Sequence, residues 1–115
     1  MKVVVVEDNA LSAELVEMLL ASEGHEVRIA RDGAEFRTLL ANEIPDIVLM
    51  DMSLPDTTGP ELLAATQGAL AGVPVLAVTA HAGDASLTSS FAAVITKPID
   101  TRTFAARVAA AARSR

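Results

Sequence analysis

Residues with chemically useful side chains follow four short apolar segments of the sequence. Glu7 and Asp8 follow the first segment, and Asp51, Thr79 and Lys97 each stand at the end of another. If these segments are strands of one parallel sheet with right-handed crossovers, their carboxyl ends lie along one edge, where such sheets bind ligands. We therefore expect these side chains, which are far apart in the sequence, to lie close together in the fold.

Three carboxylates at one edge of a sheet repel one another. At about 4 Å and an effective dielectric of about 20, each pair costs roughly 4 kcal/mol. A cation must compensate, or some of the acids must hold a proton. Lys97 supplies one positive charge, and a divalent cation would supply the rest. Because these strand ends offer oxygen ligands and no His or Cys, the site favours Mg²⁺, Mn²⁺ or Ca²⁺ over Zn²⁺.

The same residue types suit one reaction in particular. A carboxylate beside Mg²⁺, a lysine ammonium and a threonine hydroxyl can accept a phosphoryl group, because positioning and charge neutralisation do most of the work in phosphoryl transfer. An acidic pair after a strand is by itself more often a helix-capping cluster. The additional presence of Asp51, Thr79 and Lys97 favours the chemical interpretation, since a cap needs no distant carboxylate or lysine.

The elements that must position these residues are indicated by apolar runs that alternate with amphipathic stretches. The run Val3-Val4-Val5-Val6 is typical of a strand buried on both faces. The expected strands cover residues 3–6, 26–30, 47–50, 73–78 and 92–96. Five strands alternating with helical segments predict an α/β fold with a parallel sheet. The length of 115 residues suits one domain, residues 1–115.

Helices are expected between the strands, and each begins at a residue suited to capping. These capping residues are Asn9, Asp32, Thr58 and Asp100. The apolar residues of the first helix that recur at helical spacing, and that we expect to face the core, are Leu11, Leu15, Met18 and Leu19. The last crossover, residues 81–91, is close to the minimum length for a connection that includes a helix. It is rich in Gly, Ser and Thr, so a fourth helix there is expected to be shortened.

Composition and charge exclude several classes of function. The net charge of −6 disfavours nucleic acid or an anionic membrane as the main partner. The absence of cysteine excludes disulfides and thiolate sites, and it fits a reducing compartment. The apolar run before Glu7 is too short for a signal peptide or a membrane span. We therefore expect a soluble, cytoplasmic protein.

Five spaced motifs in the chain resemble those of response-regulator receiver domains, the phosphorylated modules of two-component signalling. The motifs are Val5-Val6-Glu7-Asp8-Asn9, Ile47-Val48-Leu49-Met50-Asp51-Met52-Ser53-Leu54-Pro55, Gly59, Ala77-Val78-Thr79-Ala80-His81 and Lys97-Pro98. They occur in the family's order and span the whole chain. The resemblance implies a doubly wound, five-stranded parallel sheet with the flavodoxin-like strand order 2-1-3-4-5.

The resemblance also implies a role for each acidic residue. Asp51 would be the phosphoacceptor and, with Asp8, a direct ligand of Mg²⁺. Glu7 would act on the metal ion through water, and Ser53 would supply its backbone carbonyl. The implied cofactor is therefore Mg²⁺, held by Glu7, Asp8, Asp51 and Ser53.

Two further residues would contact the phosphoryl group. Thr79 would bind one of its oxygens, Lys97 would pair with its charge, and the Lys97-Pro98 peptide would be cis. The sequence departs from the family pattern at Val94, where an aromatic residue usually stands, and in the short segment between Thr79 and Lys97. Both departures fall on the face that activated receivers commonly use for pairing, so we expect a monomer.

These inferences predict a stand-alone receiver that accepts a phosphoryl group on Asp51 from a histidine kinase or a histidine phosphotransfer protein. It would signal to a downstream protein by contact, and it would catalyse only its own phosphorylation and dephosphorylation. One alternative is a phosphorylation-independent, receiver-like scaffold, which Val94 favours and the complete set of site residues disfavours. A haloacid-dehalogenase-type phosphatase is set aside, because that family places Asp-x-Asp after its first strand, where this chain has Glu7-Asp8-Asn9.

Overall fold

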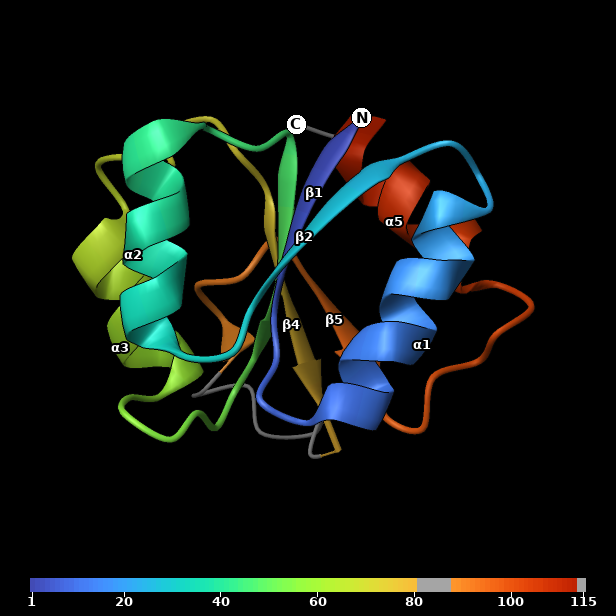
Figure 1. Ribbon diagram of the computed structural model, residues 1–115, viewed down its shortest axis with the longest axis horizontal. Coiled ribbons are helices and arrows are strands. Elements are labelled where there is room, and N and C mark those ends of the chain that lie inside the picture. Colours follow the sequence, from blue (N-terminus) through green and yellow to red (C-terminus); the bar gives the residue numbers. More distant parts are fainter. Residues whose placement is uncertain (81–87, 114–115) are drawn as a thin grey trace.

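The computed structural model describes residues 1–80 and 88–113, which form a five-stranded parallel sheet with helices on both faces (Figure 1). The strands lie in the order β2-β1-β3-β4-β5, and all four neighbouring pairs are parallel. The elements are β1 (Lys2–Val6), α1 (Ala10–Ala21), β2 (Glu26–Ala30), α2 (Gly33–Asn42), β3 (Ile47–Asp51), α3 (Gly59–Thr66), β4 (Val75–Thr79), β5 (Ala93–Thr96) and α5 (Phe104–Arg113). This topology confirms the predicted doubly wound α/β fold.

The sheet separates two apolar layers. Figure 1 shows α2 and α3 on one face and α1 and α5 on the other. Alternate residues of β1 enter opposite layers: Val4 belongs to the cluster that contains Phe36 of α2, and Val3 to the one that contains Phe104 of α5. Because both faces of β1 are covered, the strand is apolar at every position from residue 3 to residue 6, as the sequence predicted.

The buried face of α1 differs from the predicted one. Ala13, Val16 and Leu20 are buried, whereas Leu11 is 78% exposed and Met18 is 64% exposed. Leu15 and Leu19 are half-buried, and Leu19 packs against the core as predicted. The prediction was wrong for Leu11 and Met18, because α1 carries apolar residues around much of its circumference and two stripes with helical spacing were available. Periodicity cannot decide between two such stripes.

Two element boundaries differ from the expected ones by more than one residue. Val73 donates its backbone N–H to the Leu70 carbonyl at 2.8 Å, and Pro74 has no N–H to donate, so β4 begins only at Val75. The last helix, α5, begins at Phe104 after a turn of residues 101–103. Asp100 caps this turn as predicted, since its Oδ1 accepts a hydrogen bond from the Arg102 N–H and its carbonyl accepts one from Phe104, both at 3.0 Å. The shortened fourth helix expected within residues 81–91 falls largely on residues 81–87, which lie outside the described residues.

The strand β5 forms one edge of the sheet, and a side chain from α5 contacts its backbone. Arg107 donates a hydrogen bond from Nη2 to the Val94 carbonyl at 3.0 Å. The Val94 side chain is half-buried against the cluster on the α2 and α3 face. The position where the family resemblance implied an aromatic residue is therefore occupied by a small side chain that packs inward. Among the helices of the described residues, none has the length and apolar character needed to cross a membrane.

The start of α3 lies directly against the end of β3. Gly59 donates its N–H to the Met52 carbonyl at 2.9 Å. A Cβ at residue 59 would lie 2.9 Å from the Asp51 carbonyl oxygen, closer than real Cβ contacts, and 3.0 Å from the Met52 Cα, tighter than most. Glycine is thus required here for the close approach of two backbones.

Gly59→Ala is expected to destabilise the protein by about 1–3 kcal/mol, because backbone atoms rather than a flexible side chain must move. Gly68→Ala is the matched control, since a Cβ at residue 68 meets nothing within 4 Å. That control should change the free energy of unfolding by less than about 1 kcal/mol. Urea unfolding measures both values, and equal losses in the two variants would contradict the steric argument.

Candidate functional site

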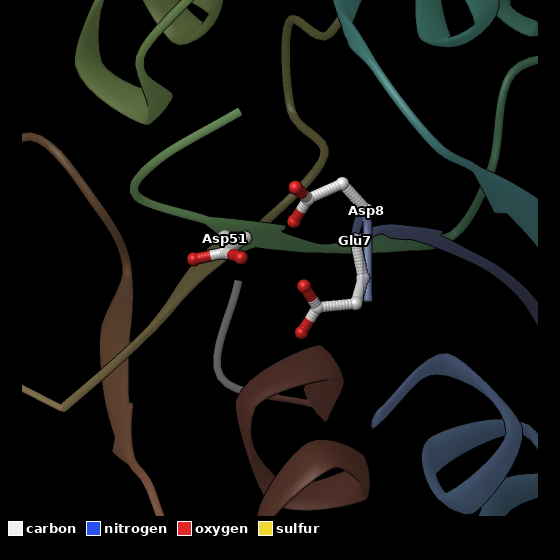
Figure 2. A group of neighbouring side chains, drawn as sticks. All are labelled: Glu7, Asp8 and Asp51. Atoms are coloured by element: carbon white, nitrogen blue, oxygen red, sulfur yellow. The ribbon is translucent and has the colours of Figure 1, made fainter. Parts of the chain in front are cut away.

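Three carboxylates lie together at the carboxyl ends of β1 and β3 (Figure 2). Parallel pairing places Val6 beside Met50, so Glu7 and Asp8 emerge next to Asp51. Each residue offers a carboxylate oxygen, and the three oxygens all lie within 4.8 Å of one another. The register of two buried strands therefore produces the acidic cluster that the strand ends predicted.

Lys97 brings the positive charge to this cluster from the end of β5. Its Nζ lies 3.0 Å from Glu7 Oε1 and 3.6 Å from Asp51 Oδ2. Burial opposes the charge on Lys97, but the hydrogen bond to Glu7 and the charge of Asp51 outweigh burial and raise the pKa of Lys97. The lysine therefore stays cationic in the site. The Lys97-Pro98 peptide is cis, as the resemblance implied.

Glu7 is the most deeply buried member of the cluster, with 5% of its surface exposed. It accepts a hydrogen bond from Lys97 through Oε1 and one from the Asn9 backbone N–H at 3.3 Å through Oε2. Burial, and then the interaction with Asp51, raise the pKa of Glu7 to about 7 in spite of Lys97. One ammonium cannot neutralise three carboxylates, so the metal-free site takes up a proton near neutral pH.

Thr79 and Ser53 stand at the same edge of the sheet as the cluster. Asp51 pairs with Val78, which places Thr79 one residue further along β4, where it is buried. The Thr79 carbonyl accepts a hydrogen bond from the Lys97 backbone N–H at 2.9 Å. Ser53 is exposed, and its backbone N–H lies 3.4 Å from Asp51 Oδ1. All the predicted site residues therefore lie at the ends of β1, β3, β4 and β5.

The acidic cluster borders a crevice of ≈ 430 Å³ between α1, β2 and the first turn of α2. Acidic side chains dominate its lining, and Arg31 is the cationic residue among them. Sequence reasoning did not single out Asp56, which lies between Asp51 and α3. Its carboxylate contacts the start of α2, and the backbone hydrogen bonds of Gly33, the largest cause, together with those of Ala34 lower the pKa of Asp56.

The donor set of the cluster fits a hard divalent cation. Carboxylate oxygens are the ligands that Mg²⁺ prefers, and the ion commonly keeps several waters while it binds only one or two carboxylates. The three carboxylate oxygens, all within 4.8 Å of one another, are close enough for Asp8, Asp51 and Glu7 to hold one such ion, directly or through a water. Such an ion would also offset the negative charge that Lys97 leaves uncompensated.

The doubly wound sheet and the charged strand ends define a class of protein in which a ligand site is assembled at the carboxyl edge of a parallel sheet. Within that class, the chain belongs to the response-regulator receiver domain family, which it matches over residues 3–109. Receiver domains are signalling modules of two-component systems rather than classical enzymes. The resemblance seen in the sequence is thus confirmed.

Several relatives are similar to the chain over most of its length. The virulence transcriptional regulatory protein PhoP of Salmonella typhimurium is 39% identical over 83 residues, which cover 72% of this chain and 37% of PhoP. An uncharacterized 14.6 kDa protein of Leptolyngbya boryana is 32% identical over 106 residues, 87% of this chain and 81% of that protein. The chain therefore spans little more than a third of PhoP but most of the second relative.

Solved structures share the fold. A CheY-like receiver domain from Methanospirillum hungatei has a TM-score of 0.90 and 26% identity, and the match covers 98% of this chain and 94% of that one. The chemotaxis response regulator CheY4 of Vibrio cholerae has a TM-score of 0.89 and 23% identity, with 96% and 97% covered. The second likeness supports the fold alone.

Neutralising one member of the cluster should stabilise the metal-free protein. Asp51→Asn or Asp8→Asn is expected to relieve a few kcal/mol of repulsion at most, which raises Tm by roughly 4–8 °C for each kcal/mol relieved. Thermal unfolding in a chelating buffer measures this change. Asp46→Asn, which alters a carboxylate at the opposite end of β3, should not raise Tm. If both cluster variants melt below the parent, the acids stabilise the fold and the repulsion argument fails.

The stability of the metal-free protein should also depend on pH through Glu7. Its pKa in the folded state, about 7, lies above its usual value of 4.5, so the folded protein binds this proton more tightly. The resulting stabilisation is fully present below pH 4.5 and is lost as the pH rises through 7, by up to about 3 kcal/mol. Denaturant unfolding across this range should show the decline in the parent and a flatter profile in Glu7→Gln. If the parent and Glu7→Gln lose stability in parallel as the pH rises, a group other than Glu7 is responsible for the loss.

Proposed function

We propose that this receiver domain accepts a phosphoryl group on Asp51 in a Mg²⁺-dependent reaction. The observation that carries the proposal is the position of Asp51: its side chain is 14% exposed, lies 3.6 Å from Lys97 Nζ, and shares the sheet edge with two further carboxylates. The carboxylate is thus reachable from solvent, and a charged partner holds it in place. These are the conditions under which a carboxylate acts as a nucleophile toward phosphorus.

The residues of the chain divide the work of phosphoryl transfer. A carboxylate oxygen of Asp51 forms a bond to phosphorus while the bond from phosphorus to the donor nitrogen or oxygen breaks, and the electron pair of that bond leaves with the donor. Lys97 neutralises charge on the transferred group, and the Thr79 hydroxyl donates a hydrogen bond to one of its oxygens. A Mg²⁺ ion held by Asp8, Asp51 and the Ser53 carbonyl, with Glu7 acting through water, would supply the remaining positive charge.

The phosphodonor in this proposal is a histidine kinase or a histidine phosphotransfer protein, and the signal passes to a downstream protein by contact. The family match over residues 3–109 supports residues 1–115 as one receiver domain. That the receiver acts alone and as a monomer stays a prediction. A phosphorylation-independent scaffold is the second candidate, which Val94 favours because this small side chain cannot supply the aromatic contact usual in the family.

Incubation with acetyl phosphate and Mg²⁺ should add one phosphoryl group to the protein, which intact-mass spectrometry detects. The modification should be absent from Asp51→Asn and from chelated samples, because each removes part of the reacting centre. Asp46→Asn provides the matched control, since this aspartate flanks the other end of β3 and should leave labelling unchanged. Labelling that persists in Asp51→Asn would refute the assignment, and a parent that takes no label with Mg²⁺ would favour the scaffold.

A further inference from the structure

Asp56 joins two segments that are distant in the sequence. It lies in the loop of residues 52–58, between Asp51 and α3, and its carboxylate reaches the first turn of α2. Oδ1 accepts a hydrogen bond from the Gly33 backbone N–H at 2.9 Å, and Oδ2 accepts one from Ala34 at 3.2 Å. A single exposed side chain thus bonds to two successive amides of another element through both of its oxygens.

The start of α2 also has a capping arrangement within its own segment. Asp32 Oδ1 accepts a hydrogen bond from the Glu35 backbone N–H at 2.8 Å, and Glu35 Oε1 reaches back to the Arg31 N–H at 3.2 Å. This reciprocal arrangement is a common way to begin a helix. Asp56 satisfies the remaining first-turn amides from outside the helix, so its distinctive contribution is to attach the 52–58 loop to α2.

Close packing reinforces this attachment. Gly33 is buried, and a Cβ at that position would lie 2.9 Å from Thr57 Cγ2 and 3.4 Å from both carboxylate oxygens of Asp56. The side chains of Asp56 and Thr57 therefore rest directly on the backbone of Gly33, and a side chain at residue 33 would have to displace them. Two hydrogen bonds and a close steric contact act at the same place.

Internal hydrogen bonds connect the tip of the 52–58 loop, near Asp56, to its base beside Asp51. A contact that holds the tip therefore also restrains the base. Leu54 donates its N–H to the Thr57 carbonyl at 3.0 Å, and Ser53 forms a bridge with Thr58. At the base, Gly59 is hydrogen-bonded to Met52 at 2.9 Å. Ser53 follows Met52 at this base. In the proposed metal site, the backbone carbonyl of Ser53 is one of the ligands.

We propose that Asp56 is a positioning residue that holds the 52–58 loop against α2 and thereby fixes the Ser53 backbone beside the acidic cluster. The proposal rests on the proposed function for its metal ion, but the attachment itself is a property of the metal-free protein. Loss of the attachment frees the loop at its tip, and the Ser53 carbonyl then samples positions away from the cluster. Removal of a group that orients a metal ligand typically weakens metal binding by about 10–100-fold.

The test compares Asp56→Ala with Asp32→Ala, because both remove a carboxylate from the first turn of α2 but only Asp56 belongs to the loop. Calorimetric titration with MgCl₂ should show affinity about tenfold weaker in Asp56→Ala and within about twofold of the parent in Asp32→Ala. Asp56→Asn keeps one acceptor oxygen and should give an intermediate affinity. All three variants are compared with the parent at matched folded fraction, checked by circular dichroism.

Hydrogen exchange in metal-free protein provides a readout that does not depend on the ion. The amides of Leu54 and Gly59 report on the loop, and the amide of Glu35 reports on the helix cap. Asp56→Ala should accelerate exchange at Leu54 and Gly59 by at least about threefold, whereas Asp32→Ala should accelerate exchange at Glu35 alone.

Several results would overturn the proposal. These are unchanged loop exchange in Asp56→Ala, identical effects of the two variants on the loop, and faster loop exchange with unaltered Mg²⁺ affinity. If the parent itself binds no Mg²⁺, the proposed function fails. The exchange comparison then decides separately whether Asp56 holds the loop.

Discussion

The electrostatic repulsion among Glu7, Asp8 and Asp51 is the constraint on which this site depends. Two of the three emerge from β1 and the third ends β3, and both strands are buried and hydrogen-bonded along their length. The backbones that carry these carboxylates are therefore fixed by the core. The carboxylates cannot move apart to reduce their repulsion. Positive charge must reduce it instead, from Lys97, from a proton on Glu7 or from a bound cation. The buried strands thus hold the three carboxylates close together, and this closeness makes the edge of the sheet attract positive charge.

The loop that follows Asp51 is held at both of its ends. At its base, Gly59 lets the start of α3 approach the backbone of Asp51 and Met52. At its tip, Asp56 bonds to α2, which packs on the same face of the sheet as α3. The segment next to Asp51 is therefore connected to two helices. Gly59 makes its connection through backbone atoms, whereas Asp56 makes its connection through a side chain with two hydrogen bonds.

Much of the fold and of the site followed from the sequence, because the underlying rules are local or topological. Continuous apolar runs identified the strands, and the shared edge of a parallel sheet predicted that Asp51 and Lys97 would meet. Two features did not follow. The buried stripe of α1 depends on which of two apolar faces meets the sheet, so Leu11 was misplaced. The role of Asp56 depends on a contact with Gly33 across 23 positions, and in the sequence this residue was indistinguishable from an ordinary turn aspartate.

The hydrogen bond from Arg107 to Val94 has a consequence for encounters between molecules. An edge strand presents unpaired carbonyl and N–H groups that can template an added strand from another chain. At β5 one such carbonyl is already occupied by a guanidinium, which also places a positive charge beside the strand. An approaching chain must displace that group and desolvate its charge before it can pair at Val94. This contact therefore makes strand addition at Val94 less favourable, on the edge of the sheet where the usual aromatic side chain is replaced by valine.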